Sequence, residues 1–531
     1  MGYLLLYFNT LRFLKMKQLF YQILYRFRKV CLRLFNLKCN VVVSNVNTNN
    51  LKLLPWIPKY CTLSNVDEFT FINKTSPFLG WNDEYNGKLW SYNLNYMDYL
   101  LQENLSFEEG KGWIMRYIED MDDNLNGLES YPIALRGINW IKFLVKYNDR
   151  LLECEKKKID TFLYMQYSIL FNNIEYHLLG NHLLENAFSL LWGGLYFGDK
   201  KIYDKSFGIL RVELQKQILE DGGHCELSPM YHEILLDRLL DCINLLKHNI
   251  IFSSQQAFLP FLEVKAGKML SWLEAIIYRD GSIPLFNDSA NKIAPVANDI
   301  FNYAMLLGLS WKKICLKESG YRKMISKCIE AIVDVGKIGA DYIPGHAHAD
   351  TFNFELRING IPFIVDTGIS TYNKNERRQY ERGTTAHNTI CIDEMNTSEV
   401  WGGFRVANRA SVLLLKDLEE SIVGVHDGYR KRGIDIQRSY TLKDDTFHIV
   451  DKIISKKKCM AVCQLILDPN VIIVAIDSTL VKTSLGVISF NNVNNVRIKE
   501  VLISKEYNSL LPTKMICFSF ISQMSLSIRP N

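Results

Sequence analysis

The chain has 531 residues, which is too long for one compact core and predicts two domains with a small third piece. Hydrophobic residues make up 48% and charged residues 22%, proportions that are ordinary for a globular protein. No run resembles a nucleic-acid-binding array, and there is no zinc-finger spacing or RNA-binding signature, so we expect no nucleic-acid partner.

Basic residues are concentrated at the start of the chain. Residues 1–66 contain ten Lys or Arg and no Asp or Glu, whereas the remainder contains 52 basic and 57 acidic residues. Within residues 1–30, Leu, Phe, Tyr and Ile recur against Lys and Arg, which predicts basic amphipathic helices. Two interpretations of this leader stay open: peripheral contact with an anionic membrane surface, or a pair of basic helices docked on the main body.

The first residues do not follow the pattern of a secretory signal. Their apolar stretch comes first, and Asn9, Thr10 and Arg12 interrupt it. The sequence contains no uninterrupted apolar run of about 18 residues, so we predict no helix that spans a membrane. The twelve cysteines form no CxxC pair, which favours a reducing compartment over a disulfide framework. Location therefore stays open between the cytoplasm and the periphery of a membrane.

Residues 67–328 are predicted to form a helical domain. Apolar residues recur at three- and four-residue spacing over residues 164–179, 213–218, 233–246 and 258–277. Short polar breaks such as EDGG and YRDGS separate these segments. Repeated helical hairpins of this kind favour an array or toroid of antiparallel helices.

Residues 329–531 are predicted to form a β-domain. The hydrophobic period changes near residue 330 to alternation, in short segments separated by turn residues every eight to twelve positions. The segment RINGIP has the Asn-Gly pair of a tight hairpin. This pattern favours an antiparallel β-sandwich, and a polar groove between the two domains is the expected ligand site.

The segment GHAHADTFNFEL carries two of the ten histidines, His346 and His348. Its alternation predicts a strand, in which both imidazoles share one face. Asp366 follows the next predicted strand, and His387 begins another. His348, Asp366 and His387 are the ligand types that zinc or a similar divalent ion prefers. His346 would then be free to carry a proton.

The helical half has polar clusters of its own. Asn181, His182 and Glu185 lie at helical spacing in an otherwise apolar segment. Tyr231 follows Ser228-Pro229, a pair typical of an N-cap and the first helical position. Each cluster is compatible with helix capping alone, but their number favours a site.

These motifs resemble the heparinase II/III-like polysaccharide lyases, which are related to the oligoalginate lyases. The segments GHAHADTFNFEL, DTGISTY and RGTTAHNTICID carry the resemblance in the β-domain. NHLLENA, DGGHCELSPMYHE and DGSIPLFNDS are the helical counterparts in the same order. The resemblance runs from about residue 80 to the last strands. The N-terminal segment is similar to that of relatives linked to bacterial surface-polysaccharide clusters.

The resemblance implies a fold and a reaction. The fold is an incomplete α/α toroid followed by an antiparallel β-sandwich. The reaction is β-elimination in a uronate-containing anionic polysaccharide, which leaves a C4–C5 double bond. The C5 proton becomes acidic only when the adjacent carboxylate is neutralised, so polar donors stabilise the enolate-like anion. A base then removes the proton, and an acid protonates the departing oxygen.

The resemblance also implies residue roles. Asn181 and His182 neutralise the carboxylate, and Tyr231 and His346 are the catalytic proton carriers. His348, Asp366 and His387 hold a structural divalent metal, expected to be zinc, that fixes loops of the β-domain. The expected substrate-binding side chains are Glu185, Arg382, Trp401 and Arg405, since Arg forks suit carboxylate or sulfate.

Two other functions stay open besides a lyase. The same histidines and carboxylate suit a metal-dependent glycan hydrolase, in which the ion activates water. A non-catalytic glycan-binding or assembly protein of the cell envelope would retain the site without the chemistry. The sequence leaves the oligomeric state, the glycan and the mode of cleavage open.

Overall fold

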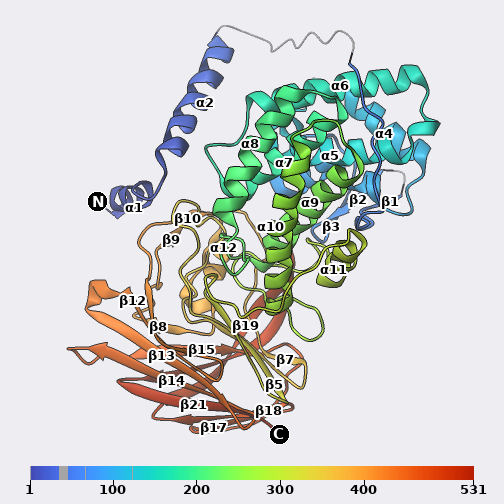
Figure 1. Cartoon of the computed structure of the whole chain (residues 1–531). Coiled ribbons are helices and arrows are strands. Elements are labelled where there is room, and N and C mark those ends of the chain that lie inside the picture. The colour runs from blue at the N-terminus through green and yellow to red at the C-terminus, as the bar shows by residue number, and fades with distance from the viewer. Residues whose placement is uncertain (1, 35–45, 66, 122–123) are drawn as a thin grey trace.

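Two helices open the chain, α1 (Gly2–Leu11) and α2 (Met16–Leu34), and both lie at the outer edge of the molecule (Figure 1). The computed structural model describes residues 2–34, 46–65, 67–121 and 124–531. The predicted leader 1–66 therefore includes residues outside the described part of the chain. Its last portion runs in extended form along the helical domain, where the backbone N–H of Asn49 donates to the carbonyl oxygen of Tyr196 at 2.7 Å.

The helical domain follows a three-stranded antiparallel sheet that the sequence pattern did not predict. This sheet consists of β1 (Leu63–Asn65), β2 (Glu68–Phe71) and β3 (Lys74–Pro77). The helices of the domain are α3 (Lys88–Tyr96), α4 (Phe107–Glu119), α5 (Ser130–Lys146), α6 (Glu153–Asn172), α7 (Gly180–Tyr196), α8 (Lys200–Gln217), α9 (Pro229–His248), α10 (Gln255–Ile276) and α11 (Ala297–Leu306).

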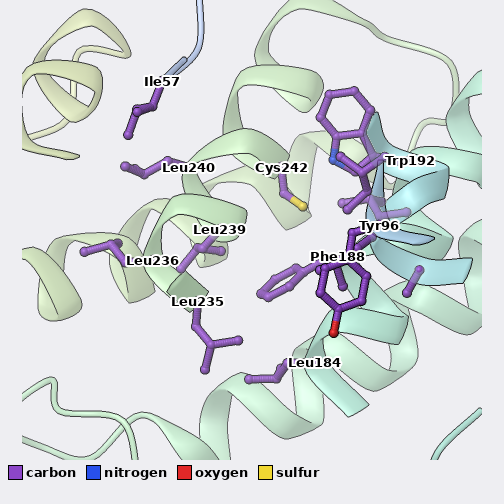
Figure 2. Packing of buried hydrophobic residues seen from close by; sticks show 14 of the residues in the cluster. Ile57, Tyr96, Leu184, Phe188, Trp192, Leu235, Leu236, Leu239, Leu240 and Cys242 are labelled. Atoms are coloured by element: carbon purple, nitrogen blue, oxygen red, sulfur yellow. The ribbon is translucent and has the colours of Figure 1, made fainter. Parts of the chain in front are cut away.

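Helices α7 and α9 form the centre of the helical core. Their apolar side chains fill the space between them, with Leu184 and Phe188 on α7 and Leu235 and Leu239 on α9 (Figure 2). Each such buried side chain stabilises the fold by roughly 2 kcal/mol relative to exposure. This packing fixes the relative position of the two helices and therefore of the residues in their first turns.

The strand-rich domain contains one eight-stranded and two four-stranded sheets, and every strand pairing in them is antiparallel. The strands of the large sheet are, in spatial order, β11 (Val412–Leu418), β12 (Ser421–Tyr429), β13 (Ile434–Lys443), β14 (Thr446–Ser455), β21 (Gln523–Pro530), β18 (Gly486–Asn491), β17 (Leu480–Thr483) and β16 (Ile473–Ile476). One four-stranded sheet has the spatial order β19 (Asn494–Glu506), β20 (Ser509–Phe520), β15 (Ala461–Ile466) and β8 (Ile390–Ile392). The other has the order β4 (Tyr321–Ile325), β5 (Ile329–Asp334), β6 (Phe354–Ile358) and β7 (Ile361–Ile364). Outside them lie the pair β9 (Val400–Trp401) and β10 (Arg405–Val406) and the helix α12 (Glu376–Glu381).

Local sequence accounts for much of this domain. Strand β13 alternates buried and half-buried side chains along nine of its positions, as a strand with one face on the core does. Asn359 and Gly360 join β6 to β7 with φ of 53° and 78°, so the predicted Asn-Gly hairpin is confirmed. The predicted fold class, an incomplete toroid followed by an antiparallel sandwich, is confirmed as well.

Two elements differ from the sequence prediction. The helix expected over 164–179 ends at Asn172, and residues 173–179 form a loop before α7. The strand expected from His346 begins only at Phe354, so both histidines lie in the loop that precedes β6. The loop 173–179 is covered by α2, which donates hydrogen bonds to Ile174 and Leu178, and the histidine loop is held by Asp288 of the helical domain.

Candidate functional site

The first turns of α7 and α9 carry the predicted residues of the helical domain. The Ser228 side chain accepts a hydrogen bond from the backbone N–H of Tyr231 at 3.3 Å, and Pro229 occupies the first helical position. The predicted N-cap is therefore confirmed. Asn181 and His182 occupy the first turn of α7. A helix N-terminus carries otherwise unpaired N–H groups and a partial positive charge, and here the Ser228 hydroxyl and the Glu226 carboxylate accept from the N–H groups of Tyr231 and Asn181.

The start of α7 depends on a close approach between two loops. Glu226 accepts hydrogen bonds from the backbone N–H of Asn181 at 2.7 Å and from its Nδ2 at 2.9 Å. Gly180, with φ of 55°, makes room for this carboxylate, because a Cβ there would lie 2.3 Å from Glu226 Oε1 and from Ile343 Cδ1. Only glycine fits this position without strain.

Tyr231 and His346 meet where the two domains join. Their ring centroids are 4.0 Å apart, and the Tyr231 hydroxyl lies 3.1 Å from the hydroxyl of Tyr372. Burial raises the pKa of Tyr231 well above its ordinary value, so the phenol stays protonated at neutral pH. His346 Nε2 lies 3.4 Å from Asn181 Nδ2 and 3.3 Å from Glu226 Oε2. Residues from α7, α9 and the loop before β6 thus converge on one imidazole.

Asp288 fixes the orientation of His346. Its Oδ2 lies 2.9 Å from His346 Nδ1 and its Oδ1 lies 2.9 Å from His348 Nε2. Arg378 donates to both oxygens, at 2.5 and 2.8 Å. Although burial opposes ionisation, Arg378 and the two histidines hold the pKa of Asp288 well below its ordinary value. An ionised carboxylate only accepts hydrogen bonds, so Nδ1 of His346 donates to Asp288, while Nε2 lies between Asn181 Nδ2 and Glu226 Oε2.

His182 is the more accessible imidazole of the site. Its side chain is 33% exposed, its ring lies 4.5 Å from that of Tyr131, and its Nδ1 lies 3.3 Å from Glu175 Oε1. Burial lowers the pKa of His182, but Glu175 and the more distant Glu226 outweigh this effect, and the pKa is raised. The raised pKa favours a cationic imidazolium, which suits contact with a carboxylate.

The predicted metal ligands lie behind the catalytic cluster. His387 Nδ1 and Asp366 Oδ2 are 2.9 Å apart, and the rings of His348 and His387 are 5.3 Å apart. Burial lowers the pKa of His348 to about 4, so its imidazole is neutral. Since His348 Nε2 donates to Asp288, its Nδ1 presents a lone pair, and this atom has no hydrogen-bond partner.

The donor chemistry of this cluster suits zinc, but its placement does not complete a site. His387 Nε2 and Asp350 Oδ2 are also buried without a hydrogen-bond partner. Asp366, in contrast, already accepts from His387, from Asn353 at 2.5 Å and from the backbone of Gly368. Among the described residues, no group of three or more His, Cys, Asp or Glu is arranged to hold a metal ion. Binding of an ion would therefore need a shift of the Asp366 carboxylate, and it stays a prediction.

Two predicted substrate-binding residues lie in the interior. Glu185 is fully buried and faces Arg238, with Oε2 to Nε at 3.5 Å, and burial raises its pKa to about 7. Arg382 is also fully buried, and its guanidinium donates to the carbonyl oxygen of Ala347 at 3.0 Å. Backbone carbonyl oxygens accept from Nε and Nη2 of Arg382, whereas its buried Nη1 has no hydrogen-bond partner, so contact of Arg382 with a glycan stays a prediction. Glu185 belongs to the helical core.

The other two predicted substrate-binding residues contact the N-terminal helix. Trp401 Nε1 donates to the Thr10 hydroxyl at 3.1 Å, and its ring lies 4.9 Å from that of Tyr7. The guanidinium of Arg405 lies 4.8 Å from the Trp401 ring. The indole N–H of Trp401 is therefore already bound by α1, Arg405 is exposed, and contact of these side chains with a glycan stays a prediction.

Sequence reasoning assigned no role to four residues of the site: Glu226, Asp288, Tyr372 and Arg378. The first two lie within motifs that did attract notice, DGGHCELSPMYHE and DGSIPLFNDS, but nothing local distinguishes them from helix-capping carboxylates. Arg378 is 90 positions from its partner Asp288, and Tyr372 is 141 from Tyr231. Only the fold brings these pairs together.

Comparisons with known proteins agree with this architecture. Residues 156–307 match the model of the heparinase II/III N-terminus, and residues 311–528 match that of the heparinase II/III-like C-terminal domain. The heparin-sulfate lyase of Pedobacter heparinus is 27% identical over 256 residues, which are 41% of this chain and 36% of that enzyme. The heparin-sulfate lyase of Bacteroides thetaiotaomicron is 23% identical over 266 residues, 42% of this chain and 38% of the enzyme.

Solved structures show the same fold over most of the chain. A crystal structure of heparinase III superposes with a TM-score of 0.70 at 16% identity and covers 92% of this chain and 88% of that one. A heparan sulfate lyase mutant of Pedobacter heparinus gives a TM-score of 0.61 at 18% identity, with 88% and 81% covered. The two family models together span most of the chain, from residue 156 to residue 528. The chain belongs to the heparinase II/III-like family.

Proposed function

We propose that the chain is a polysaccharide lyase that cleaves a uronate-containing glycan by β-elimination. The observation that carries the proposal is the convergence of Asn181, His182, Tyr231 and His346 where the two domains meet. The relatives that match in sequence are named heparin-sulfate lyases, which supports a glycosaminoglycan as the substrate class. Because the match spans about a third of those enzymes, the substrate is part of the proposal.

In this proposal the first turn of α7 binds the uronate carboxylate. The Asn181 amide and the His182 imidazolium act as its donors, and the partial positive charge of the helix N-terminus adds to them. Neutralising the carboxylate lets the electrons left at C5 delocalise into it. The C5 proton then becomes acidic enough for a protein base to remove.

Tyr231 and His346 each carry out one of the two proton transfers. The raised pKa of Tyr231 keeps its hydroxyl protonated, which favours it as the acid that protonates the departing glycosidic oxygen. His346, which Asp288 orients through Nδ1, is assigned as the base and acts through Nε2. The two rings are in contact, so both transfers occur at one sugar linkage.

The proposal is tested by incubating the chain with a panel of uronate polysaccharides and following the ultraviolet absorbance of unsaturated uronate. We expect Tyr231→Phe to lower kcat by roughly 100- to 10,000-fold, the usual contribution of general acid–base catalysis. The melting temperature should equal that of the wild type, because among the described residues this hydroxyl forms a hydrogen bond only with the Tyr372 hydroxyl. Tyr164→Phe, which removes a hydroxyl bound to Asp199 on the outer side of the toroid, is the matched control. Equal rates for Tyr231→Phe and the wild type would contradict the proposal.

We also propose that His348, Asp366 and His387 hold a structural zinc ion, with a shift of the Asp366 carboxylate on binding. The buried lone pair of His348 Nδ1 supports this, and no catalytic step depends on the ion. Elemental analysis of the purified chain should find about one zinc per molecule, by the stoichiometry of a single site. His348→Ala should lose the ion, and His448→Ala, an exposed histidine on β14, should retain it. Wild-type protein without zinc would contradict this part.

Two further predictions are more specific. The first is that the substrate is a bacterial surface polysaccharide, which rests on the similarity of the N-terminal segment alone. The second is that the basic leader contacts a membrane, through a surface that is separate from the candidate site.

A further inference from the structure

The N-terminal helices expose large apolar side chains and dock through polar ones, which is the reverse of the usual arrangement. In α2, large apolar side chains recur at intervals of four, three, four and three residues, which places them on one stripe of the helix. These side chains are between 52% and 79% exposed and are Met16, Phe20, Ile23, Phe27 and Val30. A helix that packs on a protein core normally buries such a stripe.

The opposite face of α2 is the one that docks. Gln18 is almost fully buried, and its Nε2 donates to the carbonyl oxygens of Tyr342 at 3.2 Å and Leu178 at 3.4 Å. Tyr25 donates its hydroxyl proton to the carbonyl oxygen of Ile174 at 2.5 Å. These contacts fix the rotation of the helix about its axis, so the apolar stripe points outward as a consequence of specific hydrogen bonds.

Helix α1 repeats this arrangement. Asn9 is buried, and Thr10 accepts the hydrogen bond from Trp401, so polar groups face the β-domain. Its large apolar residues are exposed instead, and they are Leu4, Leu5, Phe8 and Leu11. Figure 1 shows both helices at the outer left edge of the molecule, beyond α8 and β10.

Basic residues border the exposed stripe. At 100° per residue, Lys17 and Arg26 fall on opposite sides of the stripe of α2, and both are exposed, with the Lys17 ammonium 4.0 Å from the Tyr176 ring. Residues 1–66 contain no acidic residue to offset them. No helix of the described part of the chain is long and apolar enough to cross a bilayer. An apolar stripe between basic edges matches helices that lie in the plane of an anionic membrane.

We infer that α1 and α2 form an interfacial anchor whose exposed apolar stripe enters an anionic lipid surface. The apolar side chains lie at the boundary of the acyl chains, and Lys17 and Arg26 meet the headgroups. A second copy of this chain would cover the stripe less well, because it would bring the same basic edges together. Charge complementarity therefore selects the lipid surface as the occupant.

The test is flotation of the full chain with vesicles of phosphatidylcholine, alone or mixed with phosphatidylglycerol. We expect binding to the mixed vesicles to be at least about ten-fold tighter and to weaken with salt, since each basic residue near the surface contributes about 1 kcal/mol. The combined variant Phe20→Glu, Ile23→Glu, Phe27→Glu should lose at least about ten-fold in binding, because it carries charge into the acyl boundary. Lys17→Gln with Arg26→Gln should lose the preference for anionic lipid while retaining the apolar stripe.

The matched control is Leu413→Glu, Leu415→Glu, Leu418→Glu on the edge strand β11, which adds the same charge to another exposed apolar face. We expect this control to bind as the wild type does, and all variants to keep the wild-type melting temperature. Equal binding to neutral vesicles, no binding at all, or full binding by the α2 triple variant would overturn the inference. Self-association without lipid that the triple variant abolishes would also overturn it, by making a second copy the occupant.

Discussion

Asp288 is the residue on which the geometry of the catalytic cluster depends. One buried carboxylate accepts from both histidines of the HxH segment and from Arg378. It therefore sets the tautomer of His346 and of His348 together. The two histidines contact different oxygens of the same carboxylate. Removing one partner of such a buried pair typically costs about 3–5 kcal/mol, so Asp288 supports the fold as well as the site.

The charge of His182 should determine how activity depends on pH. Glu175 raises the pKa of His182, and an imidazolium binds a uronate carboxylate better than neutral imidazole does. Activity should be highest below the raised pKa of His182 and fall as the pH rises through it. Glu175→Gln removes the carboxylate that raises the pKa, so the falling limb of the kcat/KM profile should move to lower pH. The measurement is the pH dependence of kcat/KM for both proteins.

The control for this prediction is Glu220→Gln, which neutralises an exposed carboxylate paired with Lys268. Its profile should coincide with that of the wild type. An unshifted limb in Glu175→Gln would show that His182 does not act as a cation in the free enzyme.

At the scale of elements, two helix starts and one loop build the site. The apolar side chains packed between α7 and α9 hold the first turns of both helices at the same end of the toroid. The loop before β6 brings His346 to these turns. Leu179 and Leu227, which precede α7 and α9, have φ of 65° and 57°, and Asn287, which accepts from the backbone N–H of His348, has φ of 57°. Such backbone is costly for residues other than glycine, and it occurs where tertiary contacts over-determine the conformation.

Gly180→Ala tests the approach of these loops. The added Cβ would meet the Glu226 carboxylate and Ile343 at 2.3 Å, on a backbone with positive φ. We expect a loss of about 1–3 kcal/mol in the free energy of unfolding, the usual cost of overpacking. We also expect at least about a ten-fold loss of kcat, since a misplacement of about 1 Å costs up to about 100-fold. Gly208→Ala, in an open position of α8, should be neutral or stabilise by up to about 1 kcal/mol. Denaturant unfolding and steady-state rates measure both effects, and equal behaviour of the two variants would contradict the assignment.

These elements also show what the sequence can predict. The start of α9 is encoded locally, because Ser228 and Pro229 are a cap and a first helical residue whatever the rest of the chain does. The alternation in TFNFEL is local too, but it belongs to β6, which begins at Phe354, and it says nothing about His346. The histidine loop is held by Asp288, 58 residues away, so no local pattern reveals its shape. Arg382 looked like a free cation for the same reason, since its acceptors come from backbone carbonyls.

At the scale of the whole molecule, the toroid supplies Asn181, His182 and Tyr231 to the candidate site, and the β-domain supplies His346. Tyr231 is in the toroid, so the proton-transfer pair exists only when the two domains are docked. The N-terminal helices connect the same two domains on the outside, with α1 on the β9–β10 pair and α2 on the loop before α7. Domain contact and catalytic competence are therefore coupled in this architecture.

The most direct test of the central claim is the mass of the products from a defined uronate oligosaccharide that the chain cleaves. Elimination adds no water, so the masses of the two fragments should sum to that of the parent, and one fragment should carry the C4–C5 double bond. Tyr231→Phe and His346→Ala should each abolish these products. Fragments that together exceed the parent by one water would identify a hydrolase and contradict the account.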